Sequence, residues 1–417
     1  MRAWTQEDAE RYLLSLELFG MRFGLDRMRR LMTALENPQR RFQSIHVVGT
    51  NGKSSTTRMI AAILARHGLL TGAYTSPHLI SFEERIQIGE QDLEPAAFAA
   101  AVQRAARAAE LVNRSLTDDD RVTQFEALTA AAYGELAARG VEVAVIEAGL
   151  GGRYDATNVI PSRVQVLTSV GLEHTRWLGP TIGHIAAEKL DVVQFGGVLV
   201  LGHGLHRDAV AVAERVADER SATIIRAPAD PEVPVGALGS FQRHNFACAR
   251  AAAEALLGEL DPDAVADAAA ETRVPGRLQI IGERPLTLLD GAHNPEGIAA
   301  LVESLAEPFA AGQAPRVAVV SILDDKDAAG MLGKLSAACE ALICTRSHNP
   351  RALSPGTIQS LVNQLDGPPS EIVPDPRKAL DRARALAGAS GLVLATGSIY
   401  LVADLLAGER RISASNL

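Results

Sequence analysis

Residues 45–57 read Ile45-His46-Val47-Val48-Gly49-Thr50-Asn51-Gly52-Lys53-Ser54-Ser55-Thr56-Thr57, and this stretch decides the fold. A short β-branched run ends at Gly49, and after Gly52 apolar residues recur at helical spacing. A strand, a glycine loop, a lysine and a helix form a phosphate cradle, because glycine lets backbone N–H groups approach phosphate oxygens and the helix N-terminus adds positive partial charge. We therefore predict that a nucleotide is bound by Gly49, Thr50, Asn51, Gly52, Lys53, Ser54 and Ser55.

The spacing of the glycines differs from that of the common P-loop. The pattern Gly-x-x-x-x-Gly-Lys would need glycine at position 47, where the chain has Val47, so this loop is the shorter Gly-x-x-Gly-Lys. Lys53 is expected to reach the β- and γ-phosphates, and a hydroxyl of Ser54 or Ser55 to bind Mg²⁺. The alternative interpretation is a plain surface turn before a helix.

Composition and charge limit the class of protein. The 417 residues are 47% hydrophobic and 22% charged, which is typical of a globular chain with two or three domains. The formal net charge is −9, which argues against nucleic acid as the main partner.

The cysteines and the N-terminus bear on the compartment. Cys248, Cys339 and Cys344 form neither a disulfide pattern nor a metal-binding pattern, as expected for a reducing cytosol. The first residues lack the apolar core of a signal peptide, and no stretch reaches membrane-spanning length. We expect a cytoplasmic protein that does not bind membranes.

Two further strands are expected to end beside the glycine loop. Residues 141–146 form an apolar run that ends at Glu147, and residues 164–170 form another that precedes His174. Ligands of open α/β sheets bind at the carboxyl ends of the strands. A carboxylate at a strand end can hold Mg²⁺ opposite phosphate oxygens. The sequence thus predicts that Lys53, Glu147 and His174 meet at one edge of a sheet.

A second domain is expected after residue 274. Residues 272–277 combine proline, glycine and charge at a break in periodicity. Beyond them, apolar runs alternate with helical patterns, which predicts a smaller Rossmann-like domain over residues 275–417. Its first strand ends before Asp290-Gly291-Ala292-His293-Asn294-Pro295, where Pro295 is expected to begin a helix.

Several local features are predicted from turn and helix signals. Residues 5–35 are read as two packing helices and residues 83–88 as a short strand. The acidic residues 118–120 are interpreted as a loop. Thr123 with Glu126 has capping-box spacing, and Ser240 is interpreted as a helix cap unless its segment serves a nucleotide.

The motifs together resemble one family. The short glycine loop, residues 74–79 (Tyr-Thr-Ser-Pro-His-Leu), residues 147–158 (Glu-Ala-Gly-Leu-Gly-Gly-Arg-Tyr-Asp-Ala-Thr-Asn) and residues 290–295 resemble the folylpolyglutamate synthase/dihydrofolate synthase family of the Mur ligase superfamily. The resemblance covers nearly the whole chain. It implies an α/β fold in which a P-loop-type Mur ligase central domain, residues 1–274, precedes a Rossmann-like glutamate ligase domain.

The resemblance also implies roles for individual residues. It makes Ser76, Glu147 and His174 ligands of two Mg²⁺ ions, and it makes Lys189 a carbamylated lysine that acts with Lys53 and His174 in catalysis. On the nucleotide side it assigns Asn245 to the adenine and Arg277, Asp290 and His293 to the ribose and phosphates. On the pterin side it assigns Arg85 and Asp155.

The reaction implied is the ATP-dependent addition of L-glutamate to dihydropteroate, to a reduced folate, or to both, through an acyl phosphate. We expect a monomer. Two details depart from the family pattern: Glu173 stands where aspartate is usual, and Lys189 is followed by Leu190-Asp191-Val192 in place of Ala-Gly-Ile.

Three alternatives remain. Another Mur-type enzyme, such as a muramyl-peptide ligase, would need an N-terminal UDP-binding domain and would not need the glycine-rich run after Glu147. A P-loop ATPase that moves partners would hydrolyse ATP without glutamate. A folate-binding protein without catalysis would not need Lys53, Glu147 and His174 together.

Overall fold

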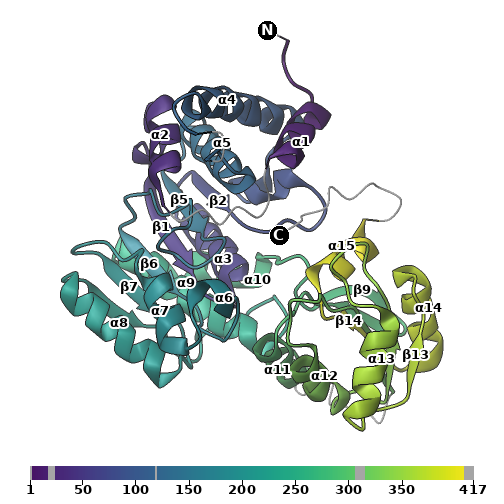
Figure 1. The fold of residues 1–417 in the computed structure, drawn as a ribbon. Coiled ribbons are helices and arrows are strands. Elements are labelled where there is room, and N and C mark those ends of the chain that lie inside the picture. The colour runs from purple at the N-terminus through teal and green to yellow at the C-terminus, as the bar shows by residue number, and fades with distance from the viewer. Residues whose placement is uncertain (1, 17–23, 118–119, 306–314, 408–417) are drawn as a thin grey trace.

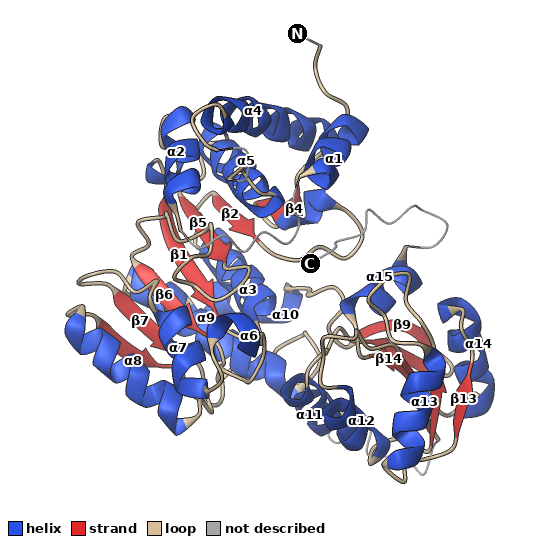
Figure 2. Cartoon of the chain, viewed as in Figure 1, coloured by secondary structure: helices blue, strands red, loops and turns tan. Residues whose placement is uncertain are grey.

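The computed structural model describes residues 2–16, 24–117, 120–305 and 315–407, which form two layered α/β units (Figures 1 and 2). Each unit is a mostly parallel sheet with helices on both faces. Most of the link between the two predicted leader helices, and Asp118 and Asp119 of the acidic loop, lie outside the described residues. The two leader helices themselves are α1 (Gln6–Ser15) and α2 (Asp26–Ala34).

The first unit has eight strands in the order β4-β3-β2-β5-β1-β6-β7-β8. Pairing is parallel from β2 to β8 and antiparallel at the β2–β3–β4 edge. The strands are β1 (Gln43–Val48), β2 (Thr71–Tyr74), β3 (Ile86–Ile88), β4 (Gln91–Asp92), β5 (Val143–Glu147), β6 (Val164–Leu167), β7 (Val198–Leu201) and β8 (Thr223–Arg226). The helices after α2 are α3 (Lys53–Arg66), α4 (Pro95–Asn113), α5 (Gln124–Ala138), α6 (Thr175–Leu178), α7 (Ile182–Leu190), α8 (Arg207–Glu219), α9 (Ser240–Leu257) and α10 (Pro262–Glu271), with 3₁₀ turns η1 (Pro38–Arg40) and η2 (Phe82–Arg85).

Alternate residues of the central strands pack on opposite faces of this sheet, as the period of two requires. Ile45 and Val47 of β1 pack with α3, α9 and α10, whereas Val48 packs with α7 and α8. Helices α1, α2, α4 and α5 form a further core against Tyr74 and Ile146. Burial on both faces explains why these strands read as continuous apolar runs.

The second unit has six strands in the order β13-β12-β11-β14-β10-β9. The strands are β9 (Gln279–Glu283), β10 (Leu286–Leu289), β11 (Arg316–Val320), β12 (Ala341–Cys344), β13 (Ser370–Ile372) and β14 (Leu392–Thr396). Helices α11 (Pro295–Ser304), α12 (Ala328–Ser336) and α13 (Pro355–Gln364) cover one face, and α14 (Pro376–Ala387) and α15 (Ile399–Leu406) cover the other. The α/β fold with a Rossmann-like second unit is confirmed, and Pro295 begins α11 as predicted.

The strand predicted over residues 83–88 was wrong in part. Residues 83–85 belong to η2, so the strand expected over 83–88 is confined to Ile86–Ile88. Glu84 explains the change, since its carboxylate accepts hydrogen bonds from the backbone N–H groups of Leu79, Ile80 and Ser81 and so closes a turn.

Ser240 does not cap α9, because the cap position is Gly239. The Ser240 N–H donates instead to the hydroxyl oxygen of Ser304 in the second unit, at 3.0 Å. The capping box of α5 is confirmed: Thr123 accepts from the Glu126 N–H, and the Glu126 carboxylate accepts from the Thr123 N–H.

The two units are joined between Glu271, where α10 ends, and Gln279, where β9 begins. The domain boundary at residues 274/275 lies in this connection and stays a prediction. None of the helices that the structure describes is long and apolar enough to cross a membrane. All three cysteines are buried and free.

Candidate functional site at the domain interface

The P-loop, residues 49–53, needs its two glycines because neighbouring groups approach them closely. A Cβ on Gly49 would lie 1.9 Å from the Thr168 hydroxyl oxygen, and one on Gly52 would lie 2.4 Å from Oδ1 of Asn245. Gly52 also has a φ of 84°, which non-glycine residues rarely adopt. The loop therefore passes tightly between the end of β6 and α9, and Asn245 lies against it.

Hydroxyl groups after β6 hold the loop in place. The Asn51 N–H donates to the Ser169 hydroxyl at 2.8 Å, and the Thr168 hydroxyl donates to the Asn51 carbonyl at 2.7 Å. The Thr50 hydroxyl accepts from the Gly171 N–H at 3.0 Å. The side chain of Thr50 thus shapes the loop, and β6 fixes the backbone that precedes α3.

Two lysines lie on the same backbone carbonyl of the P-loop. Lys53 Nζ donates to the Gly49 and Thr50 carbonyls at 3.1 and 3.2 Å, and Lys189 Nζ, from α7, donates to the Gly49 carbonyl at 2.8 Å. Lys189 is 4% exposed. Burial, and after it the charge of Lys53, lowers the pKa of Lys189 to about 7. Lys189 is therefore not a solvated lysine on the surface of a helix.

Glu147 lies at the end of β5 and is 1% exposed. Its two oxygens accept from the Ser54 hydroxyl at 2.9 Å and from the Ser76 N–H at 3.0 Å. Burial raises the pKa of Glu147, and the charge of Lys53 opposes the rise. Ser54 is the P-loop hydroxyl that reaches Glu147, whereas Ser55 is buried within α3 and makes no bond to that carboxylate.

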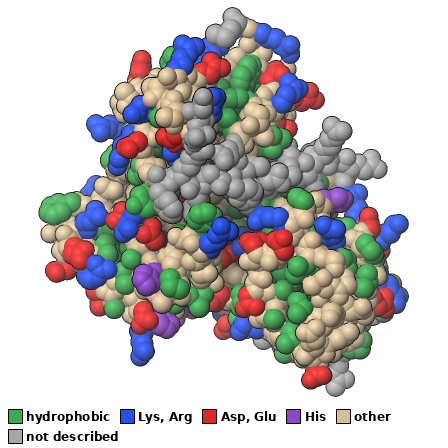
Figure 3. Space-filling model, in the orientation of Figure 1, with side chains coloured by type: hydrophobic (Ala, Val, Ile, Leu, Met, Phe, Trp, Pro, Cys, Tyr) green, Lys and Arg blue, Asp and Glu red, His purple; other side chains and the backbone are tan. Residues whose placement is uncertain are grey.

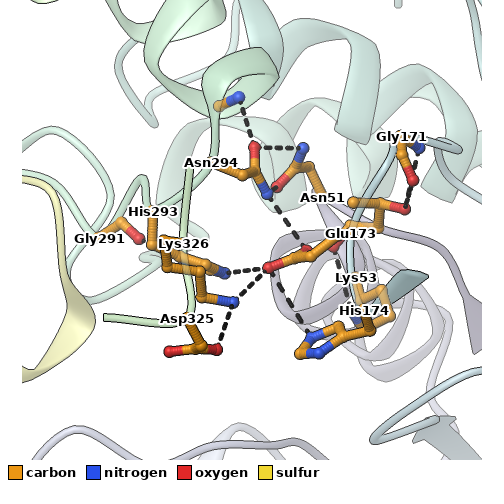
Figure 4. A network of polar contacts seen from close by, with 12 residues as sticks. Asn51, Lys53, Gly171, Glu173, His174, Gly291, His293, Asn294, Asp325 and Lys326 are labelled. Atoms are coloured by element: carbon orange, nitrogen blue, oxygen red, sulfur yellow. Dashed lines mark hydrogen bonds and ion pairs between the residues drawn. The ribbon is translucent and has the colours of Figure 1, made fainter. Parts of the chain in front are cut away.

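Glu173 is the centre of a polar network between the two domains (Figure 4). One oxygen of Glu173 lies 2.7 Å from Lys326 Nζ, 3.4 Å from His293 Nε2 and 3.8 Å from His174 Nε2. Burial alone would raise the pKa of Glu173, but His293, Lys326 and His174 together hold it well below its usual value. Burial lowers the pKa of His174 to about 4, so its imidazole is neutral at pH 7.

A pair of amides also joins the P-loop to the second domain. Asn51 Nδ2 donates to Asn294 Oδ1 at 3.2 Å, and Asn294 Nδ2 donates back to Asn51 Oδ1 at 2.9 Å (Figure 4). Asn294 is at the same time the N-cap of α11, since its Oδ1 accepts from the Gly297 N–H at 2.7 Å. One side chain therefore serves both helix α11 and the interface.

Arg277, Asp290 and His293 gather around the turn after β10. Asp290 accepts from the Leu278 N–H at 2.9 Å and from the Ala292 N–H at 2.8 Å. A Cβ on Gly291 would lie 2.3 Å from a guanidinium nitrogen of Arg277, so the arginine packs directly on this turn. The turn is thus ordered by its own hydrogen bonds, and it meets the first domain where His293 contacts Glu173.

The two residues expected on the pterin side lie in the first domain and have internal partners. Asp155 accepts from the Leu150 N–H at 2.8 Å and from the Thr157 N–H at 3.0 Å, which folds the glycine-rich run back on itself. Arg85 is 1% exposed, and its Nε lies 3.0 Å from His78 Nδ1. Their roles toward a substrate stay predictions.

The structure therefore brings three groups of predicted residues to the interface: the P-loop with Lys53 and Lys189, the Ser54–Ser76–Glu147 cluster, and the turn around Asp290. Sequence reasoning gave no role to Asn294 and Lys326 and treated Glu173 only as a departure from the family pattern. Lys326 follows the end of β11 at the same edge of the sheet as Asp290, and this position was the available signal.

Within the described residues, no three His, Cys, Asp or Glu side chains gather closely enough to hold a metal by themselves. The oxygen donors shown at Glu147 are its carboxylate and the hydroxyl of Ser54, and Ser76 meets the carboxylate through its backbone N–H. Such oxygens suit a hard cation that takes its remaining ligands from phosphate and water. Charged side chains of both signs are interspersed over the face shown in Figure 3. Such a surface lacks the single-sign stripe of a nucleic-acid interface on that face.

Comparison with known proteins agrees with this geometry. Residues 276–399 match the family model of the Mur ligase glutamate ligase domain. The chain is 36% identical to folylpolyglutamate synthase of Lacticaseibacillus casei, covering 79% of this chain and 83% of that protein. It is 30% identical to dihydrofolate synthase/folylpolyglutamate synthase of Bacillus subtilis, covering 96% and 98%. It spans only 50% of a Haloferax volcanii relative described as a probable bifunctional folylpolyglutamate synthase/dihydropteroate synthase.

Solved structures lead to the same family. The fold superimposes on Mycobacterium tuberculosis folylpolyglutamate synthase, complexed with ADP and AMPPCP, with a TM-score of 0.88 and 31% identity over 96% of this chain and 98% of that one. For Escherichia coli FolC with DHPP and ADP, the TM-score is 0.85 and the identity 29%, over 97% of both chains. Because it shares this fold and is identical at 30% of positions along almost the whole length of the Bacillus subtilis protein, the chain belongs to the folylpolyglutamate synthase/dihydrofolate synthase family of the Mur ligase superfamily.

Proposed function

We propose that this protein uses ATP to add L-glutamate to a carboxylate of dihydropteroate, of a reduced folate, or of both. The acceptor carboxylate attacks the γ-phosphorus of ATP and ADP leaves. The amine of glutamate then attacks the acyl phosphate, loses a proton, and phosphate leaves. The observation that carries the proposal is the meeting of the P-loop with the turn around Asp290, through Asn51–Asn294 and Glu173–His293.

The nucleotide would lie between these two loops. The first N–H groups of α3 and the ammonium of Lys53 offer positive charge to the phosphates, which is most of what phosphoryl transfer requires of a protein. Asn245 lies against Gly52, at the side where the resemblance expects the adenine. Arg277, Asp290 and His293 lie around the turn of the second domain that meets the first domain through His293 and Glu173, and they would contact the ribose and phosphates.

Two Mg²⁺ ions fit the residues present. Ser54, Ser76 and Glu147 would hold the first, and the neutral imidazole of His174 would contribute to the second. The ions supply charge neutralisation on the phosphate oxygens when bound. Glu147 is held in position by Ser54 and Ser76 without them, so the chain itself orients this carboxylate.

Lys189 is proposed to carry a carbamate. A buried ammonium beside Lys53 and near cations is unfavourable, whereas a carbamate reverses the charge and offers oxygen ligands of the kind Mg²⁺ prefers. Carbamate formation starts from a neutral amine, and the lowered pKa of Lys189 supplies one near pH 7.

A labelling experiment tests the carbamate. Protein equilibrated with ¹³C-bicarbonate should show a carbamate carbon resonance that is absent in Lys189→Ala and present in Lys334→Ala, which removes an exposed lysine of α12. Lys189→Ala should also lose nearly all synthesis, with partial recovery when short carboxylates are added. An active Lys189→Ala enzyme without the resonance in the unaltered protein would contradict the assignment.

The proposed reaction is tested by the dependence of phosphate release on both substrates. Release from ATP should require an acceptor, and the glutamylated product should appear only with L-glutamate. Parallel assays with dihydropteroate and tetrahydrofolate decide between one activity and two. ATP hydrolysis that needs neither glutamate nor a pterin would support a partner-moving ATPase instead, and activity with a muramyl peptide would support the other Mur-type ligase.

The proposed function also bears on the oligomeric state of the protein and on the compartment in which it works. Every residue assigned above comes from a single chain, so we propose that the monomer is the active unit. Buried free cysteines are compatible with work in the cytoplasm, which stays a prediction.

A further inference from the structure

A small cavity of about 40 Å³ lies between the two domains beside the P-loop helix. One wall is α3, through Ser54 and Arg58, and the opposite wall is the interdomain connection, through Arg277. Thr75 adds a hydroxyl, and Leu79 and Ile399 are among the apolar side chains that complete the lining. Since Ser54 also donates to Glu147, the cavity begins directly beside the proposed metal and phosphate end of the site.

The cavity carries two guanidinium groups that lack a carboxylate partner. Neither Arg58 nor Arg277 makes an ion pair with any described residue, and the Arg277 hydrogen bond goes to the Gly276 carbonyl at 3.1 Å. The one carboxylate in the lining, Glu84, already accepts from three backbone N–H groups of its own turn. Because arginine stays charged in proteins, the cavity is a site for a small anion.

The charge of Arg58 is costly where it lies. Burial lowers the pKa of Arg58, and the charges of Asp92, Glu84 and Glu147 only partly oppose the fall. A buried charge that is not paired within the chain is stabilised if a ligand pairs with it. Arginine suits a planar carboxylate, because its nitrogens can donate two parallel hydrogen bonds to the two oxygens.

The volume decides what part of a ligand fits. About 10–15 Å³ of such volume already admits one water molecule, so a cavity of about 40 Å³ admits a small polar group such as a carboxylate. Ser54 borders both the cavity and the Glu147 carboxylate, so one ligand can reach from the phosphate end into the cavity. Ser54 and Arg58 are four residues apart on one face of α3, about one helical turn, or roughly 6 Å, along its axis.

This spacing matches the short carbon chain between the two carboxylates of one glutamate. We propose that Arg58 binds the α-carboxylate of the terminal glutamate of a folate acceptor while its γ-carboxylate faces the phosphate end beside Ser54. The inference rests on the proposed function. It makes Arg58 a specificity-determining residue, since dihydropteroate has a single carboxylate, which reacts, and would leave Arg58 without a partner.

The test compares two acceptors that differ only at the α-carboxylate. One is tetrahydrofolate, and the other is its α-carboxamide, which keeps the reacting γ-carboxylate. Unaltered enzyme should prefer tetrahydrofolate in kcat/KM by roughly 10- to 100-fold, the usual range for a hydrogen bond to a charged group. Arg58→Gln should lose this preference by raising KM for tetrahydrofolate, with little change for the carboxamide.

Two further variants separate recognition from folding. Arg58→Lys keeps the charge without the paired hydrogen bonds and should recover part of the preference. Arg215→Gln removes an exposed arginine of α8 and should leave both acceptors unchanged. ADP affinity measured without acceptor should be the same in all of these proteins.

Equal losses with both acceptors in Arg58→Gln would overturn the assignment of the α-carboxylate. So would a preference that survives in Arg58→Gln, because another group would then bind that carboxylate. Absence of glutamate ligation by the unaltered enzyme with either acceptor and with dihydropteroate would overturn the proposed function itself, and the role of Arg58 with it.

Discussion

The two domains contain the same strand–turn–helix unit and use it differently. In the first domain β1 leads through the P-loop to α3, whose cap position is Gly52, and no described side chain accepts from the first N–H groups of that helix. In the second domain β10 leads through residues 290–294 to α11, whose first turn is capped by the side chain of Asn294. Both turns lie at the carboxyl end of a parallel strand and both face the interface.

The difference shows what makes a helix N-terminus an anion site. In α3 the N–H groups are left to a ligand, and glycine at the cap allows the close backbone approach that phosphate needs. In α11 the side chain of Asn294 satisfies an N–H group, so that turn offers side chains to a ligand: Arg277, Asp290 and His293. Under the proposed function, one domain would bind the nucleotide mainly through its backbone and the other mainly through side chains.

Removing the lysine from the backbone cradle gives the largest expected effect. Lys53→Ala should lower kcat by roughly 10²–10³, about 3–4 kcal/mol, since one charge contact to the phosphates is lost in a water-poor site. Steady-state synthesis and circular dichroism measure rate and fold. Lys334→Ala, an exposed lysine of α12, is the matched control. Near-normal activity in folded Lys53→Ala would end the distinction between the two turns.

Adding one methyl group at the cap of α3 sharpens the comparison. Gly52→Ala places a Cβ 2.4 Å from Asn245 Oδ1 at a φ of 84° and should cost roughly 1–3 kcal/mol in ATP affinity or stability. Gly89→Ala also has a positive φ, 56°, but its Cβ would meet open space. Calorimetric titration with ATP and thermal melting should show a binding defect in Gly52→Ala alone. Equal ATP affinity in both variants would contradict the tight-loop explanation.

The smallest effect is expected from the capped helix. Asn294→Ala removes the cap of α11 and should lower the free energy of unfolding by about 1 kcal/mol, and it should also weaken ATP binding because Asn51 loses its partner. Ser354→Ala removes a comparable cap from α13, where Ser354 accepts from the Thr357 N–H. Denaturant unfolding should give similar losses, with ATP affinity changed only in Asn294→Ala. An unchanged ATP affinity would mean that the amide pair does not support the P-loop.

Much of the fold was predictable from the chain because its central strands are buried on both faces. The runs that end at Val48 and Glu147 are apolar and bounded by glycine, so their place at the centre of the sheet follows from composition. Edge elements were harder to predict. The strands β9 and β13 are partly exposed and mixed in polarity, and the turn of η2 depends on a carboxylate bonding to its own backbone.

The residues of the site were predictable where one segment supplies the chemistry, as in the P-loop. Individual contacts between side chains of distant segments were not predictable. Glu173 and Lys326 are 153 residues apart, and neither has a local signal for the other. Arg58 looks like an ordinary polar helix residue until the second domain places Arg277 across the cavity.

The pair of amides between Asn51 and Asn294 has a consequence for how the two substrates affect each other's binding. Because it ties the nucleotide loop to the opposite domain, the spacing of the domains and the occupancy of the loop are thermodynamically linked. Linkage of this kind is reciprocal. If an acceptor that draws the domains together raises the affinity for the nucleotide, the nucleotide must raise the affinity for the acceptor by the same factor. Nucleotide and acceptor would then raise each other's affinity through the spacing of the domains, in addition to the contact between their reacting atoms.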